Sequence, residues 1–115
     1  MERLYISQAG PSVRVKLIHV KRLEADTILT ESEVDDFPGL RNALLECRVK
    51  SSVDSYQAEF ERLNPTPTIL ELEAEVAYKL AELLRRKTGK SLYESAMTLE
   101  TPYGSYVMAV EHHCG

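Results

Sequence analysis

The sequence lacks three features that would assign it to a broad class of protein. No apolar run approaches the roughly 18 to 20 residues that a membrane span needs, and residues 1–5 do not have the basic, then apolar pattern of a signal peptide. Fourteen Lys and Arg stand against eighteen Asp and Glu, so the chain has no basic surplus with which to neutralise phosphates. We therefore expect a cytoplasmic protein that binds neither membranes nor nucleic acid.

The chain also has few residues for cross-links and no familiar catalytic motif. Its two cysteines, Cys47 and Cys114, form no disulfide framework, and Cys47 falls on an apolar helical face where a small core residue is expected. No nucleophile elbow, phosphate-binding loop or dinucleotide-binding glycine motif occurs. The sequence thus leaves open whether the protein is an enzyme, and it predicts no cofactor.

Length and composition are those of an ordinary globular protein. The 115 residues are 43% hydrophobic and 28% charged, which excludes disorder as the main feature. We expect a single domain over residues 1–115, with a frayed tail at about 111–115.

Short stretches of alternating or β-branched residues predict strands at both ends of the chain. Apolar residues alternate with basic ones over 13–17, the period of a half-buried strand, and residues 4–6 are a candidate partner. Residues 27–30 also resemble a strand. Two further strands, 96–101 and 105–110, are joined by a short hairpin connection.

Helical spacing of apolar residues is found in the middle of the chain. A first set covers 40–47 and a second covers 49–63, and periodicity alone does not show whether they form one helix or two. The clearest helix begins at Thr68, where Thr68 and Glu71 fit a capping box, and ends at Gly89. A start at Thr66 competes with it.

The predicted order is strand, strand, helix, helix, strand, strand. This order favours an α+β fold in which an antiparallel four-stranded sheet carries two helices on one face. Such a sheet has two edges, and pairing of edges between subunits would protect them. We therefore expect a homo-oligomer.

Several polar residues are candidates for a site, each with an alternative structural role. The tail residues His112, His113 and Cys114 are able to bind metal, but neighbouring strand residues point to opposite faces and a solvated terminus is the alternative. We therefore predict no metal site. His19 fits a structural histidine, and Asp35-Asp36 fits a cap of the following helix rather than a carboxylate pair.

Glu100 is the acid most easily related to ligand binding. It lies at the end of a predicted strand, where a carboxylate can accept two parallel hydrogen bonds from a guanine-like or pterin-like edge. The structural alternative is an edge-strand charge that discourages aggregation.

Four short strings occur in sequence along this element order: Val34-Asp35-Asp36-Phe37, Val53-Asp54-Ser55, Asn64-Pro65-Thr66 and Glu100-Thr101-Pro102. The strings and the element order resemble the pyruvoyl and carboxytetrahydropterin synthases, the T-fold (tunnelling fold) enzymes. The resemblance implies that edges join into a barrel and that Glu100 anchors a pterin ring. The family's zinc histidines and catalytic cysteine are missing, since only His19 lies in the corresponding region, so the resemblance implies no zinc-dependent chemistry.

These observations lead to two hypotheses. In the first, a T-fold-like homo-oligomer binds a pterin-like or purine-like ring through Glu100, with Thr101 and Tyr103 at the pocket mouth and Asp54 as the catalytic acid or base. In the second, the chain is a small homo-oligomeric interaction or scaffold protein with no small-molecule ligand. A third possibility is a metal held by the tail of one subunit and by groups of another.

Overall fold

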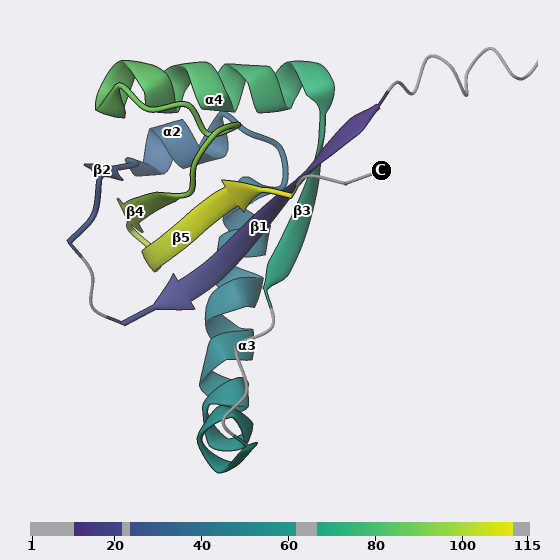
Figure 1. Cartoon of the computed structure of the whole chain (residues 1–115), viewed down its shortest axis with the longest axis vertical. Coiled ribbons are helices and arrows are strands. Elements are labelled where there is room, and N and C mark those ends of the chain that lie inside the picture. Colours follow the sequence, from purple (N-terminus) through teal and green to yellow (C-terminus); the bar gives the residue numbers. More distant parts are fainter. Residues whose placement is uncertain (1–10, 22–23, 62–66, 112–115) are drawn as a thin grey trace, which may run out of the picture.

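The computed structural model describes residues 11–21, 24–61 and 67–111, which form an α+β structure (Figure 1). Strands and helices alternate irregularly along the chain. All the strands meet in one sheet. The elements are β1 (Ser12–Val20), β2 (Thr27–Ile28), α2 (Glu31–Asp35), α3 (Leu40–Glu61), β3 (Thr68–Glu73), α4 (Ala74–Thr88), β4 (Met97–Thr101) and β5 (Gly104–Val110). The candidate strand at 4–6 lies outside the described residues.

The sheet has five strands in the order β2-β4-β5-β1-β3. β1 pairs with β3 and β5, and β5 pairs with β4, all antiparallel, whereas β2 runs parallel to β4. The prediction of a four-stranded antiparallel sheet with two helices was therefore wrong in its details: the sheet is mixed, and three helices accompany it among the described residues.

The helix predicted from Thr68 is the main correction. Residues Thr68–Glu73 form strand β3, and the helix begins only at Ala74. The segment alternates a buried Leu72 with exposed Glu71 and Glu73, and all six of its residues pair with β1. The capping signal was outweighed because the strand gains a full ladder of backbone hydrogen bonds and buries an apolar side chain, which local propensity does not register.

The predicted end of the helix at Gly89 is confirmed. Gly89 adopts the left-handed conformation at φ 78° and its N–H donates to the carbonyl of Arg85 at 2.8 Å, which ends α4. Three basic residues occupy the last turn of α4, as its dipole favours. The two apolar sets between 40 and 63 form one continuous helix of 22 residues, α3, up to Glu61.

A short helix that the sequence did not predict follows β2. Thr30, expected in a strand, is the N-cap of α2: its Oγ1 accepts from the N–H of Glu33 at 3.2 Å, and the Glu33 carboxylate accepts from the N–H of Thr30 at 2.9 Å. Asp35 ends this helix and Asp36 is its C-cap. The expectation that this pair starts the following helix was wrong.

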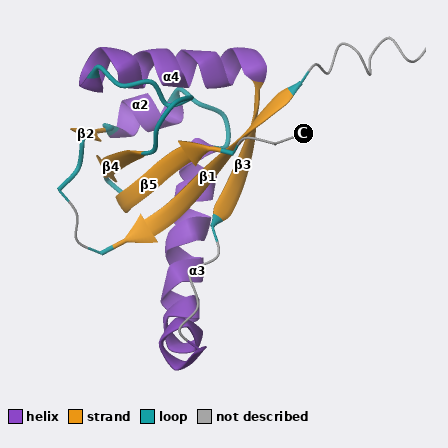
Figure 2. Cartoon of the chain, viewed as in Figure 1, coloured by secondary structure: helices purple, strands orange, loops and turns teal. Residues whose placement is uncertain are grey.

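The hydrophobic core lies between one face of the sheet and the helices (Figure 2). Alternate residues of the central strands are fully buried there, among them Val15, Leu17, Tyr106 and Met108. Leu44 of α3 and Leu80 of α4 are also fully buried on that side. Cys47, predicted to be a small core residue, is 4% exposed, which confirms the prediction. We call this the covered face of the sheet.

Candidate functional site

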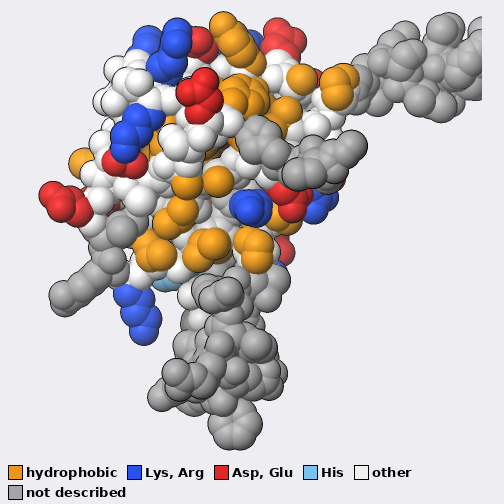
Figure 3. Space-filling view, viewed as in Figure 1, with side chains coloured by type: hydrophobic (Ala, Val, Ile, Leu, Met, Phe, Trp, Pro, Cys, Tyr) orange, Lys and Arg blue, Asp and Glu red, His pale blue; other side chains and the backbone are white. Residues whose placement is uncertain are grey.

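The opposite face of the sheet is apolar over several strands (Figure 3), and the described helices do not cover it (Figure 1). Strand alternation directs every second residue toward it. The register places the central ones in three rows across β3, β1, β5 and β4, and the pairs Arg14/Glu71 and Ser12/Glu73 continue this side of the sheet at one end of β1 and β3. We call this surface the open face; its nine positions are Ile69, Lys16 and Ala109 in the first row, Ile18, Val107 and Thr98 in the second, and Val20, Ser105 and Glu100 in the third.

Apolar side chains form the middle of the open face. Five of the nine positions are Ile, Val or Ala, and each of these five is half-buried. Large contiguous apolar patches on a protein surface often mark interaction sites. The open face therefore has the composition of a contact surface.

Two opposite charges lie on a diagonal of the open face. Lys16 lies in the first row and Glu100 in the last, and neither forms an ion pair with another described residue. Arg14, farther along β1, is already engaged by Glu111 and, at 3.3 Å, by Glu71. The hydrogen bond and the charge of Glu111 raise the pKa of Arg14 further. Within the nine positions, Lys16 and Glu100 are thus the charges available to a partner; beyond the three rows, Glu73 is a further exposed acid on the same side of the sheet.

The three residues predicted to bind a ring are not brought together in one hollow. Glu100 is exposed on the open face beside Ile28 of β2, whose side chain is 57% exposed. Thr101 is on the covered face at 8% exposure; its Oγ1 accepts from the N–H of Tyr103 at 3.0 Å and donates to the carbonyl of Gly104 at 2.9 Å. Thr101 therefore shapes the hairpin turn, Tyr103 is partly buried against the core, and Glu100 is exposed.

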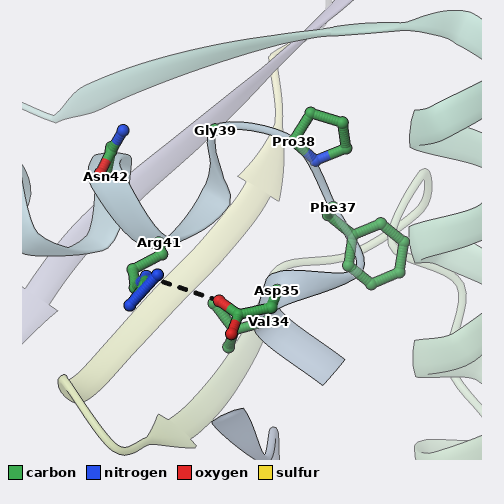
Figure 4. A pocket seen from close by; sticks show the side chains of 7 residues that line it. All are labelled: Val34, Asp35, Phe37, Pro38, Gly39, Arg41 and Asn42. Atoms are coloured by element: carbon green, nitrogen blue, oxygen red, sulfur yellow. Dashed lines mark ion pairs between the residues drawn. The ribbon is translucent and has the colours of Figure 1, made fainter. Parts of the chain in front are cut away.

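The acidic candidates of the helical region have different surroundings. Asp54 lies in α3, but its side chain is outside the described part of the structure. Asp35 forms an ion pair with Arg41 at 3.5 Å beside a small hollow of about 180 Å³ where α2 meets α3 (Figure 4). This ion pair neutralises the one cation that lines the hollow.

His19 lies on the covered face, near the end of β1. Its Nδ1 is 3.4 Å from Oγ of Ser51, and its ring meets Tyr106 edge-on at 5.2 Å between centroids. Burial, followed by the charges of Arg48 and Lys21, lowers the pKa of His19. Burial also raises the pKa of Tyr106 to about 12. Both side chains are therefore neutral near pH 7 and support the packing of α3 on the sheet.

A groove between α2 and α4 is larger than the hollow beside Asp35. It has a volume of about 640 Å³, and Phe37, Tyr78 and Leu83 supply its apolar lining. Lys87 binds both carboxylate oxygens of Glu33, at 2.7 and 2.9 Å, and ties the two helices together. Charges of both signs surround this groove, which points to no particular ligand.

Metal ligands are not gathered in the part of the chain that the structure describes: no three of its His, Cys, Asp and Glu side chains could share an ion. The tail residues His112, His113 and Cys114 lie outside that part. No helix within the described residues is long and apolar enough to cross a membrane.

The apolar open face was missed from the sequence, although a signal for it exists. Residues 17–20 (LIHV) and 106–110 (YVMAV) are nearly continuous apolar runs, which are typical of strands buried on both faces. The prediction for β1 rested on the alternation over residues 13–17 and did not use the apolar run that follows it.

Comparisons with known proteins identify no relative of the chain. The chain matches no family model, and it has no significant match among curated proteins or solved structures. The resemblance to T-fold enzymes therefore stays a prediction.

Proposed function

We propose that this chain is a self-associating interaction protein and that its open face receives a second copy of the same chain. The observation that carries the proposal is the apolar second face of the two central strands, β1 and β5. Their residues Ile18, Val20, Val107 and Ala109 are half-buried without any described helix over them. A strand with both faces apolar requires cover on both sides, and the helices supply only one.

The charges of the open face favour a second copy over a partner of a single charge sign. The nine positions carry one cation, Lys16, and one anion, Glu100. A surface with one charge of each sign can complement itself when it is repeated by a two-fold axis. An acidic or a basic partner would leave one of the two charges facing a like charge.

Sedimentation velocity over a concentration series tests this proposal. We expect the wild-type chain to change from monomer to dimer as its concentration rises. Val107→Glu places a carboxylate in the middle of the open face, so this variant is expected to stay monomeric. Val49→Glu is the matched control, because Val49 is 64% exposed on α3, away from the open face. A wild-type chain that stays monomeric at millimolar concentration would refute the proposal.

A second candidate function is binding of a pterin-like or purine-like ring at Glu100. One observation favours it: the exposed carboxylate of Glu100 is adjacent to the exposed apolar side chain of Ile28 at the same end of the sheet. A ring stacked on Ile28 would direct its donor edge toward the carboxylate. Titration with neopterin should then give saturable quenching that Glu100→Gln weakens sharply. Equal quenching in both proteins would exclude Glu100 from such a site.

A further inference from the structure

Lys16, Val107 and Glu100 lie on one diagonal of the open face. Lys16 of β1 is paired with Ala109 of β5, and Val107 is two residues along β5 from that pair. From Val107, the same step leads to Glu100: one strand across to Thr98 of β4, then two residues along. Val107 is therefore the midpoint of the diagonal.

The spacing of a sheet sets the length of this diagonal. With strands about 4.8 Å apart and residues about 3.4 Å apart, Lys16 and Glu100 are separated by roughly 17 Å between their backbones. That distance is too long for an ion pair within one subunit. It also leaves an apolar centre at Val107 between two charged ends.

We propose that two copies pack with their open faces against each other and are related by a two-fold axis. The axis lies in the plane of the interface, passes next to Val107 and is perpendicular to the diagonal. A rotation about this axis exchanges the two ends of the diagonal. Lys16 then faces Glu100 of the partner subunit, and the symmetry repeats this contact, so that one dimer contains two such ion pairs. Val107 meets Val107 of the partner subunit at the centre. This arrangement rests on the self-association proposed above and specifies its geometry.

Other symmetric arrangements are less favourable. An axis along the diagonal would place Lys16 against the partner's Lys16 and Glu100 against the partner's Glu100, and like charges in an interface are repulsive. Pairing through the outer edge of β3 would bring together strands that carry exposed Glu71 and Glu73, the type of edge charge that opposes strand addition. The other edge strand, β2, has only two residues.

A charge-exchange experiment tests the arrangement. Lys16→Glu and Glu100→Lys each place two like-charged contacts in the dimer, so each should weaken the dimer at least tenfold in sedimentation equilibrium at low salt. The double variant restores opposite charges with their positions exchanged and should recover most of the affinity. Lys79→Glu and Glu94→Lys, exposed positions away from the open face, make the same charge changes and should leave the affinity unchanged.

The outcomes separate this inference from the proposal on which it rests. If the wild-type chain dimerises, Val107→Glu abolishes the dimer and the two single charge variants have no effect, then self-association stands and the two-fold arrangement is wrong. Two weakened single variants without recovery in the double variant also refute the arrangement. A wild-type chain that never dimerises refutes both. Circular dichroism of each variant checks that the charge changes leave the fold intact.

Discussion

The two faces of the sheet are made from alternate residues of the same strands, yet they differ in what covers them. On β1, Leu17 is fully buried by helices, whereas its neighbour Ile18 is only half-buried. Tyr106 and Val107 of β5 show the same contrast. Both faces are apolar, so strand composition alone does not distinguish them. The helices account for one set of apolar residues, and the self-association proposed above would account for the other.

The largest expected difference between the faces is in stability. Leu17→Ala leaves a cavity under the helices and should lower the free energy of unfolding by about 2 to 5 kcal/mol. Ile18→Ala removes a half-buried side chain, and its cost in the monomer should be about 1 kcal/mol. Urea denaturation of dilute protein measures both. Equal losses would mean that the open face is packed as tightly as the core within a single subunit.

A smaller contrast concerns the polar group of a core residue. The hydroxyl of Tyr106 donates to the buried carbonyl of Leu44 at 2.6 Å. Tyr106→Phe leaves that carbonyl without this donor and should cost about 1 to 2 kcal/mol of stability. Val107→Thr, one residue along, should cost less than about 0.5 kcal/mol in the dilute monomer and should weaken the dimer instead. A clear loss of stability of Val107→Thr in dilute solution would contradict the view that Tyr106 belongs to the core and Val107 to the dimer interface.

The smallest expected effect is the pH dependence of the free energy of unfolding that arises from His19 on the covered face. Because its folded-state pKa lies below the ordinary value of 6.5, His19 binds a proton more readily in the unfolded chain. Its contribution to stability is complete above pH 6.5 and decreases as the pH falls toward the folded-state pKa. His19→Gln should therefore reduce the loss of stability between pH 7 and about pH 5.5 in urea denaturation.

The open face should respond differently over the same pH range, because none of its nine positions is a histidine. The dimer affinity measured by sedimentation should be the same at pH 7 and at about pH 5.5 once both samples are fully folded. A dimer that weakens in parallel with the titration of His19 would show that the two faces are coupled.

Much of the fold could be predicted because its signals are local. Gly89 ends a helix through its own backbone conformation, and the strands Met97–Thr101 and Gly104–Val110 flank a short turn that marks a hairpin. Thr68–Glu73 could not be predicted in the same way. Its capping signal is local, but its strand conformation depends on pairing with β1, more than fifty residues earlier in the chain.

The candidate site was predictable only in part, for a similar reason. Glu100 was selected as an exposed acid at a strand end, and the structure places it on a surface. Its relation to Lys16 and Val107 depends on the register of three strands, which residue patterns do not give. The nearly continuous apolar run over residues 106–110 was the signal that both faces of β5 need cover.

Chemical cross-linking at the proposed symmetry axis tests the central claim most directly. Val107→Cys in a Cys114→Ser background places one accessible thiol at the centre of the open face, since Cys47 is 4% exposed. A short bismaleimide should convert this variant to a species of twice the monomer mass. Val49→Cys in the same background should stay monomeric, because Val49 lies on α3. Cross-linking at Val49→Cys but not at Val107→Cys would contradict the claim that the open face receives a second copy.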